Sequence, residues 1–281
     1  DAGRTGRRRI AVPGAGFADT RAAARANRAV GNALGHAAIE LCSPGLRLTF
    51  HRATFVALSG REPEAVLERA DFQGGRMAMP RDVAVRVRPG NALTVTRLGS
   101  GARAFGAIAG LLAPTLLGSA SVDRASGLLR PLSDGDGFDV RAVDADRIPR
   151  EAARGDATRT TVRIILGPQA DHFDAANIEA FLGAAWRTGL DSDRVGARLD
   201  GPRLHHAGAS EIVSDGMVPG CIQVPPDGRP IVMLADCPTT GGYPKIGCVV
   251  SDDLPLVAQA IPGRTPIRFE AVNVEDVLYR S

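Results

Sequence analysis

Short stretches in which apolar and polar residues alternate recur along the chain, and they constrain the fold more than any other feature. They cover residues 46–50, 83–87, 93–98, 162–166 and 267–272. A period of two residues is typical of a strand with one buried face, and Pro, Gly and Asp fill the intervals. Many short strands of this kind favour barrels or sandwiches, so we expect a mainly β protein with a few helices.

Helices are predicted at few places. Asp19 is a suitable N-cap for a helix over about residues 20–34, which Gly35 would end. Asp174 is the N-cap of a second predicted helix, and a weaker candidate lies over residues 254–259.

The chain is long enough for two subdomains, since it has 281 residues and single cores stop growing at roughly 250–300 residues. A polar stretch over residues 144–160 has no periodic apolar pattern. We interpret it as a linker between an N-terminal β-rich subdomain over 1–150 and a C-terminal β-rich subdomain over 160–281.

Composition excludes several classes of function. The net charge is only +3, which gives no nucleic-acid footprint, and no apolar run approaches the roughly 20 residues of a membrane span. The four cysteines lack zinc-site spacing, so we expect reduced thiols, no metal site and a cytoplasmic location. The run Arg7-Arg8-Arg9 is interpreted as a solvated face.

A hairpin is predicted around Pro225-Pro226-Asp227-Gly228, which separates the apolar runs 222–224 and 231–234. Proline presets φ and glycine accepts a positive φ, so this composition favours a tight turn. The second strand of the hairpin would end at Asp236, where the most unusual segment of the chain begins.

That segment, residues 236–245, gathers several groups that could perform chemistry. Gly241 and Gly242 allow close approach of the backbone to a ligand, and their N–H groups could cradle an oxyanion or phosphate. The hydroxyl groups of Thr239 and Thr240 could join them. Further donors or charges in the segment are Tyr243 and Lys245, the only lysine of the chain. A tight loop whose polar groups bond to one another is the open alternative.

A second cluster lies over residues 192–201, where two arginines alternate with aspartates. Arg194 and Arg198 could clamp a carboxylate, with Asp193 positioning them, although a structural ion-pair turn is the favoured interpretation. The Gly-rich run 13–19 lacks the third glycine and the βαβ context of a dinucleotide site, and no P-loop or G-x-S-x-G motif is present.

Several motifs, in order, resemble one known family. The C-terminal run TTGGYPKIGCVVSDDLPLVAQAIPGRTPIRF, the upstream GCIQVPPDGRPIVMLAD, the stretch SDRVGARLDG and the element ILGPQADHF are similar to the allophanate hydrolase subunit 2 family. This family is also called carboxyltransferase A/B or KipA-like, and it includes the C-type subunit of 5-oxoprolinase. The resemblance extends over essentially the whole chain.

The resemblance implies two subdomains related to cyclophilin-like barrels and a stable complex with a subunit 1 (KipI-like) protein. It also implies an ATP-dependent amidohydrolase acting on a small amide or lactam, with ATP used by the assembly. Two alternatives stay open. One is a non-catalytic KipA-like subunit that sequesters its partner, and the other is a carboxyltransferase component of a biotin-dependent urea-carboxylase-like system.

The chain departs from the family pattern at positions that bear on activity. Ala15 stands where the family usually has Ser, Ala120 where it has Arg, Val122 where it has Thr, and Pro238 where it has Gln. Loss of such donors implies altered substrate choice or reduced activity.

Under this interpretation, the predicted catalytic residues are Asp236, as base or loop-orienting group, Tyr243, and Lys245, which would neutralise developing charge. The predicted substrate-binding residues are Thr239, Thr240, Gly241, Gly242, Arg194, Arg198, Asp193 and Gln223.

Overall fold

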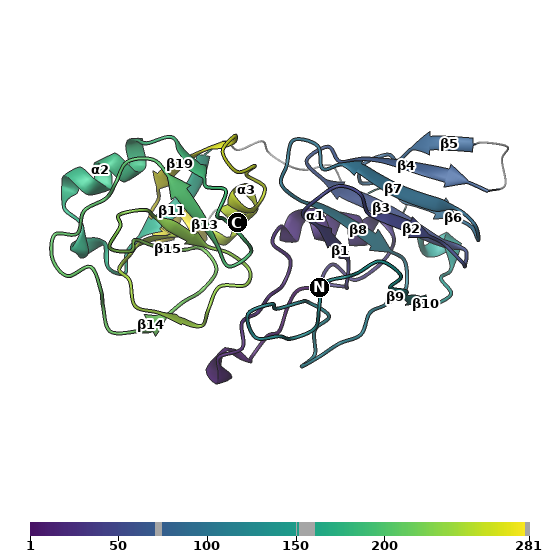
Figure 1. Cartoon of the computed structure of the whole chain (residues 1–281), viewed down its shortest axis with the longest axis horizontal. Helices are drawn as coiled ribbons and strands as arrows, with labels where there is room; N and C mark the ends of the chain where they lie inside the picture. Colours follow the sequence, from purple (N-terminus) through teal and green to yellow (C-terminus); the bar gives the residue numbers. More distant parts are fainter. Residues whose placement is uncertain (71–74, 150, 152–160, 279–281) are drawn as a thin grey trace. The chain divides into compact units, whose positions relative to one another are not determined.

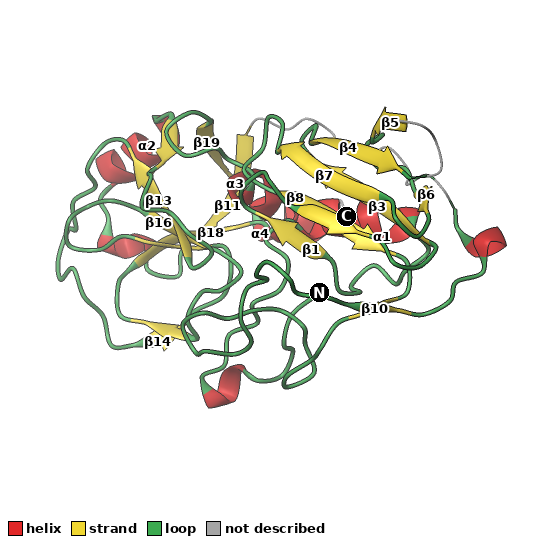
Figure 2. Cartoon of the chain, turned by 45° about the vertical axis from the view of Figure 1, so that its right-hand side comes forward, coloured by secondary structure: helices red, strands yellow, loops and turns green. Residues whose placement is uncertain are grey.

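The computed structural model describes residues 1–70, 75–149, 151 and 161–278, and it divides into two compact units. The first unit comprises Asp1–Gly3 and Asp19–Asp156, and the second comprises Arg4–Ala18 and Ala157–Ser281. Figure 1 labels the elements of both units along the chain. Loops join most of the short strands, as the green segments of Figure 2 show.

The first unit is built on two four-stranded sheets and a two-stranded one. The first sheet has the order β1 (Ile39–Leu41), β8 (Ala104–Ile108), β3 (Thr54–Gly60) and β6 (Val85–Val87). The second has the order β2 (Arg47–Thr49), β7 (Ala92–Arg97), β4 (Glu64–Arg69) and β5 (Gly75–Ala78). The two-stranded sheet pairs β9 (Leu111–Leu112) with β10 (Asp139–Val140).

The core of the first unit lies between its two large sheets. Val56 and Leu58 of β3 pack in one apolar cluster with Leu67 of β4 and Val95 of β7. Every residue of β3 is buried, because its other face packs against α1 (Thr20–Ala29). A strand covered on both faces need not alternate in sequence, and TFVALSG shows little alternation.

The helix α1 confirms the predicted start and is shorter than predicted. The Asp19 carboxylate accepts a hydrogen bond from the Ala22 N–H at 2.9 Å, as an N-cap should. The helix ends at Ala29, well before residue 34, and the chain turns at Gly31 with φ of +74°. The Asn27 side chain then donates to the His36 carbonyl at 2.8 Å, which holds this turn.

The second unit contains a closed, seven-stranded β-barrel. Its strand order is β11 (Thr161–Leu166), β18 (Lys245–Val249), β15 (Cys221–Gln223), β16 (Ile231–Met233), β13 (Gly196–Asp200), β12 (Trp186–Thr188) and β19 (Pro266–Ala271). The barrel closes through a parallel pairing of β19 with β11, and its other pairs are antiparallel. Phe181, Trp186 and Phe269 are buried in its core.

Short elements complete the two units. They are η1 (Arg8–Ile10), η2 (Ala145–Arg147), η3 (Ala170–His172), α2 (Ala175–Gly183), η4 (Ser251–Asp253), α3 (Leu254–Ala258), α4 (Val274–Leu278) and the ribbon strands β14 (Asp215–Gly216) and β17 (Thr240–Gly241). The N-cap predicted at Asp174 is present, since its carboxylate accepts the Asn177 N–H at 2.8 Å. Within the described ranges, no helix is long and apolar enough to cross a membrane.

The structure confirms the mainly β class and a barrel, while the strands of the first unit form separate sheets. The prediction of a subdomain over 1–150 assigned residues 4–18 to the N-terminal part, and the structure groups them with the second unit. The reason is local bonding: the Ala15 N–H donates to the Ala235 carbonyl at 3.1 Å. Residues 150 and 152–160 of the predicted linker lie outside the described residues.

Candidate functional site

The hairpin that leads to the predicted loop is present as expected. Ile222 pairs with Val232 and Gln223 pairs with Ile231, which joins β15 to β16. At the turn, the Gly228 N–H donates to the Pro225 carbonyl at 2.9 Å, and Gly228 has φ of +74°. A side chain there would meet the Leu204 carbonyl oxygen at 2.5 Å, so this turn requires glycine.

Three of the predicted site residues stand in one row on the outer face of the barrel. The register pairs Arg198 of β13 with Ile231 of β16, Ile231 with Gln223 of β15, and Gln223 with Lys245 of β18. Neighbouring strands lie about 4.8 Å apart, so Arg198 and Lys245 are separated by roughly 14 Å. Gln223 and Lys245 are therefore direct neighbours, and Arg198 is not.

The predicted loop is a narrow two-stranded ribbon. Thr240 of β17 pairs with Gly216 of β14, and Gly241 pairs with Asp215. Backbone bonds extend the pairing on both sides, from the Met217 N–H to the Thr239 carbonyl at 3.0 Å and from the Ile212 N–H to the Gly242 carbonyl at 2.8 Å. The segment is therefore fixed by backbone pairing.

Lys245 lies beneath this ribbon and is almost completely buried. Its ammonium group is 2.5 Å from the Asp215 carboxylate and 3.3 Å from the Gly216 carbonyl. The Lys245 N–H donates to the side-chain oxygen of Gln169 at 3.2 Å, and the Gln169 N–H donates to the Lys245 carbonyl at 3.1 Å. The hydrogen bond from Lys245 is the main reason why the pKa of Asp215 is below its usual value.

Gly241 packs directly on the barrel face. A Cβ at this position would stand 2.5 Å from the Gln223 side-chain nitrogen and 3.2 Å from the Met217 sulfur. The Gln223 amide in turn donates to the Tyr243 carbonyl at 3.3 Å. The backbone at Gly241 does approach another group closely, but that group is the side chain of Gln223 and not a ligand.

The tip of the ribbon carries the donors that remain accessible. Thr240 and Tyr243 are exposed, and Thr239 and Gly242 are half-buried. Among the described residues, the N–H groups of Gly242 and Tyr243 donate no hydrogen bond. Two adjacent N–H groups that donate to no other group can bind an anion.

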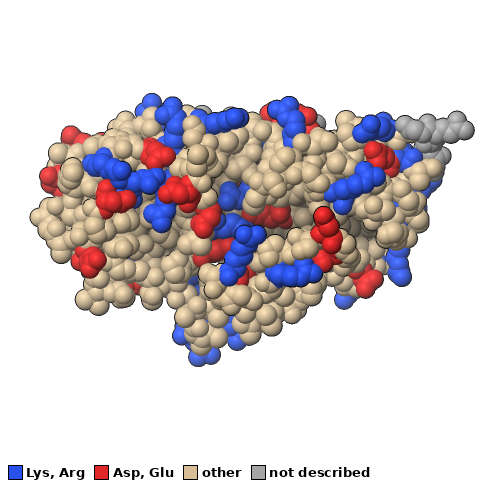
Figure 3. Space-filling view, in the orientation of Figure 1, with Lys and Arg blue, Asp and Glu red and all other residues tan. Residues whose placement is uncertain are grey.

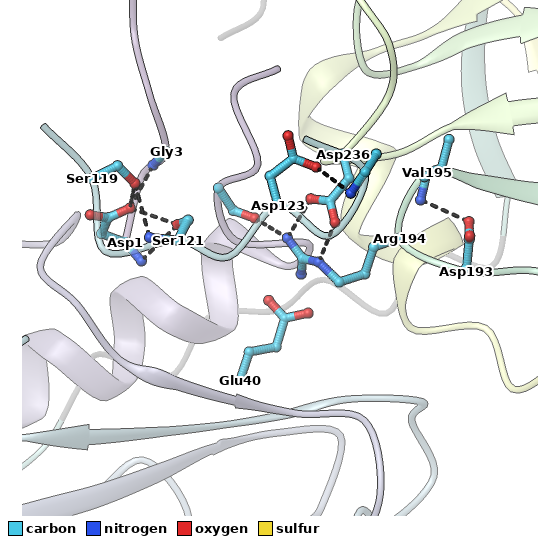
Figure 4. A network of polar contacts seen from close by, with 12 residues as sticks. Asp1, Gly3, Glu40, Ser119, Ser121, Asp123, Asp193, Arg194, Val195 and Asp236 are labelled. Carbon is cyan, nitrogen blue, oxygen red and sulfur yellow. Dashed lines mark hydrogen bonds and ion pairs between the residues drawn. The ribbon is translucent and has the colours of Figure 1, made fainter. Parts of the chain in front are cut away.

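Asp236 and Arg194 form a second polar group in the same unit (Figure 4). The Arg194 guanidinium contacts both carboxylate oxygens of Asp236, at 3.0 and 2.9 Å, and it also donates to the Gly16 carbonyl at 2.6 Å. The Asp236 N–H donates to the Arg194 carbonyl at 2.9 Å. These bonds attach the end of the hairpin to the segment Arg4–Ala18, so both residues act here as a brace.

Asp193 and Arg198 are engaged elsewhere. The Asp193 carboxylate accepts the N–H groups of Val195 and Gly196 at 2.8 and 3.1 Å, which closes a turn before β13 (Figure 4). Arg198 lies 3.5 Å from the carboxylate of Asp191, with both side chains about half exposed. The ion-pair-turn interpretation therefore describes this cluster better than a substrate clamp does.

Three contributors to the site were not predicted. Asp215 and Gln169 hold Lys245, and Arg8 donates to the carbonyls of Met217 and Pro238 on either side of the ribbon. Gln169 lies inside the recognised element ILGPQADHF, which was the available signal for it. The solvated-face interpretation of Arg7-Arg8-Arg9 is wrong for Arg8, because this side chain binds backbone groups of the barrel unit. Acidic and basic side chains are otherwise interspersed on the face shown in Figure 3.

The positions that depart from the family pattern lie in different places. Pro238 adjoins the ribbon, and its carbonyl accepts a bond from Arg8 at 3.2 Å. Ala15 is fully buried, in the second unit. Ala120 and Val122 belong to the first unit, where the Ala120 N–H donates to the Asp1 carboxylate at 2.7 Å. Only Pro238 therefore bears directly on the ribbon.

Comparison with known proteins places the whole chain in one family. The family described as carboxyltransferase domain, subdomain A and B, matches residues 10–271. The chain is 34% identical to the C-type subunit of 5-oxoprolinase from Escherichia coli (strain K12), with 99% of this chain and 89% of that protein aligned. It is 29% identical to urea amidolyase of Saccharomyces cerevisiae, of which it covers 16%.

Solved structures with the same fold belong to longer chains. The crystal structure of TTHA0988 superimposes with a TM-score of 0.83 and 33% identity, over 96% of this chain and 52% of that one. The K. lactis urea amidolyase gives a TM-score of 0.84 and 27% identity, over 98% of this chain and 18% of that one. This chain thus spans about half of TTHA0988 and less than a fifth of the amidolyase. On the strength of the match over residues 10–271, the chain belongs to the carboxyltransferase A and B domain family.

Proposed function

We propose that this chain is a subunit of an ATP-dependent amidohydrolase of the 5-oxoprolinase or allophanate hydrolase type, active only in complex and acting on a small amide or lactam. The observation that carries the proposal is the similarity to the C-type subunit of E. coli 5-oxoprolinase, which extends over 99% of this chain and 89% of that protein. Because the alignment covers most of both chains, it favours two equivalent subunits rather than two proteins that share one domain.

The tip of the ribbon is the proposed anion-binding element. Attack on an amide carbonyl places negative charge on its oxygen, and preorganised donors stabilise that charge. The N–H groups of Gly242 and Tyr243 donate to no group among the described residues, and Thr239 and Thr240 carry hydroxyl groups in the segment just before them. The Tyr243 phenol is exposed, and in this proposal it is the proton donor.

Lys245 and Gln223 support this element from below. The Lys245 ammonium is held by Asp215 and the Gly216 carbonyl, so its charge acts on the ribbon through β14. Gln223 donates to the Tyr243 carbonyl and contacts Gly241. In this proposal both are positioning residues, and so are Asp236 and Arg194, which fix the segment before the ribbon.

The described residues of the ribbon do not fit a triphosphate site. No P-loop motif is present in the sequence, and the one lysine is buried against Asp215. Two N–H groups and two hydroxyl groups suit one small anionic group better than three phosphates. We therefore assign ATP to the assembly, and no step on this chain involves it.

The proposed partner is a subunit 1 (KipI-like) protein. TTHA0988 supports this, because only 52% of that chain corresponds to the present one. In TTHA0988 the same fold is thus joined to a further segment of similar length. A separate polypeptide of comparable size could take the place of that segment here.

Reconstitution tests the proposal. The chain is mixed with a subunit 1 protein and the further subunits of the assembly, and ATP-dependent conversion of 5-oxoproline to glutamate is measured with and without it. We expect turnover only with the chain present, and a loss of ~10²-fold for Tyr243→Phe or Thr240→Ala. The exposed Thr115→Ala in the first unit is the matched control and should retain full activity.

The outcomes separate the competing functions. Full activity of both variants removes the Tyr243 phenol and the Thr240 hydroxyl group from the mechanism. Complex formation without turnover of any amide supports the KipA-like regulatory subunit instead, and failure to form a complex contradicts both.

A carboxyltransferase component is the second candidate, favoured by the family description and by the likeness to urea amidolyases. It predicts transfer of a carboxyl group from a carboxylated biotin carrier to urea, in a reaction that needs this chain. The same reconstituted assembly, supplied with such a carrier in place of ATP and 5-oxoproline, distinguishes the two.

A further inference from the structure

Two cysteines face each other on adjacent strands of the barrel. Cys221 of β15 is the register partner of Cys248 of β18. Residues directly opposite each other in an antiparallel pair have Cα atoms roughly 4.5–5.5 Å apart. A disulfide requires a Cα separation of about 4.4–6.8 Å, so the backbone already meets this condition. Both residues are free thiols in the structure.

The two side chains also meet each other. Register partners project from the same face of a sheet, so the Cys221 and Cys248 side chains are neighbours. The neighbouring Cys248 thiol, with a smaller contribution from the charge of Lys245, lowers the pKa of Cys221 to about 6. A thiolate beside a thiol is the state that thiol–disulfide exchange needs.

Access differs between the two sulfurs. Cys221 is buried in an apolar cluster with Met217, Ile231 and Met233, whereas Cys248 is partly exposed. Gly220 lies next to Cys248, and a Cβ at Gly220 would be 3.4 Å from the Cys248 sulfur. Because Gly220 has no side chain, residue 220 does not cover the Cys248 sulfur. A small reagent can thus approach the pair from the Cys248 side.

We propose that Cys221 and Cys248 form a redox-active dithiol, which closes to an intramolecular disulfide by exchange with a small disulfide such as glutathione disulfide. The sulfur anion of the pair attacks one sulfur of glutathione disulfide, and the first glutathione leaves as its thiolate. The remaining cysteine, deprotonated, attacks the mixed disulfide and releases the second glutathione. Both cysteines are oxidised and one glutathione disulfide is reduced, while the one proton of the pair and one proton from solvent end on the two glutathione molecules.

The location links this pair to the proposed site. Cys221 is two residues before Gln223, and Cys248 is three residues after Lys245. Closure would cross-link the two strands that carry these positioning residues, and it would remove the thiolate whose charge interacts with Lys245.

Peptide mapping of the whole chain tests the proposal. The folded protein is incubated with glutathione disulfide, unfolded, alkylated, and cut with trypsin and an Asp-specific protease. These cuts place Cys221 on peptide 215–226, Cys237 on 236–245 and Cys248 on 246–251. We expect a disulfide between peptides 215–226 and 246–251 and the loss of two of the four alkylated thiols. Four alkylated thiols after incubation, or a link that involves Cys237, overturns it.

Single substitutions provide a second measurement. Cys221→Ser and Cys248→Ser should each abolish the intramolecular link, while Cys237→Ser and Cys42→Ser should retain it. Cys237 is the matched buried control, since burial raises its pKa to about 11. Cys42 is the exposed control. A link that persists in Cys221→Ser contradicts the proposal, and the mapping of the unsubstituted chain stands even if a variant does not fold.

Discussion

The ammonium group of Lys245 lies 2.5 Å from the carboxylate of Asp215, and the two side chains differ strongly in their solvent exposure. Only 2% of the Lys245 side chain is exposed, compared with 50% of Asp215. Water can therefore replace Lys245 at Asp215, but it cannot readily replace Asp215 at Lys245. Loss of the carboxylate leaves a buried charge with the Gly216 carbonyl as its remaining acceptor in the described structure.

Asp215→Asn should therefore destabilise the second unit at neutral pH, and the difference should depend on pH. Folding lowers the pKa of Asp215, so the folded chain holds this proton less readily than the unfolded chain. The pair's contribution is then complete above the unfolded pKa of about 3.9 and is lost as the pH falls through the lower folded pKa. Urea unfolding midpoints of both proteins should converge at low pH. The control Asp134→Asn, at an exposed position, should have the same midpoint as the unsubstituted chain at every pH, so that its curve shows no pH-dependent difference.

Gly241→Ala should destabilise the ribbon by about 1–3 kcal/mol, because its methyl group would overlap the Gln223 side-chain nitrogen at 2.5 Å. The overlapping group is the end of a flexible side chain, so Gln223→Ala should relieve most of this cost. A double-mutant cycle on the free energy of unfolding measures the coupling. Gly242→Ala is the neighbouring control, since its Cβ would meet the Ile212 carbonyl at an ordinary 3.5 Å. Additive effects of the substitutions at 241 and 223 would show that the two groups do not clash.

The extent to which sequence predicted this molecule depends on how local each feature is. The alternation of residues 162–166 and the turn at Gly228 reflect neighbouring residues, and both were found in the structure. The barrel strand β12 escaped prediction because three residues cannot show a period. The separate sheets of the first unit were missed because alternation shows which residues are buried and not which strands pair.

The candidate site was likewise predicted only where its features are local in sequence. The segment 236–245 stood out by composition, and its ribbon tip carries the accessible donors. Its supporting contacts come from far along the chain: Asp215 is 30 residues and Gln169 is 76 residues from Lys245. No local pattern identifies such partners. The recognised family motif contained Gln169, but the role of that residue became visible only from its bonds to Lys245.

Arg194 and Arg198, which are four residues apart, should respond very differently to replacement. Arg194→Ala removes a two-point contact with the buried Asp236 and a bond to the Gly16 carbonyl, and we expect a loss of about 2–3 kcal/mol in the free energy of unfolding. Arg198→Ala removes one exposed contact of 3.5 Å with Asp191 and should cost under about 1 kcal/mol. Urea denaturation of both variants measures the contrast, and equal losses would contradict the bracing role of Arg194.

The effect of the neighbouring Cys248 on Cys221 should be visible in a thiol titration. Because the pKa of Cys221 is lowered to about 6, thiolate absorbance of the folded chain should rise near that pH. An ordinary thiol titrates near pH ~8.5. Cys248→Ala removes the neighbouring thiol and should move this step toward the ordinary value. Cys237→Ala should leave the step in place, because the pKa of Cys237 is raised to about 11. A step that is unchanged in Cys248→Ala would show that another group lowers the pKa of Cys221.

The same shift predicts how stability responds to pH between about 6 and 8.5. In this window the folded chain has released the Cys221 proton and the unfolded chain still holds it, so stability should rise with pH. The gain is complete above the unfolded pKa and is lost as the pH falls through the folded pKa of about 6. Urea midpoints across the window should therefore increase for the unsubstituted chain and change less for Cys221→Ser. Parallel curves for the two proteins would mean that Cys221 is not a thiolate at neutral pH.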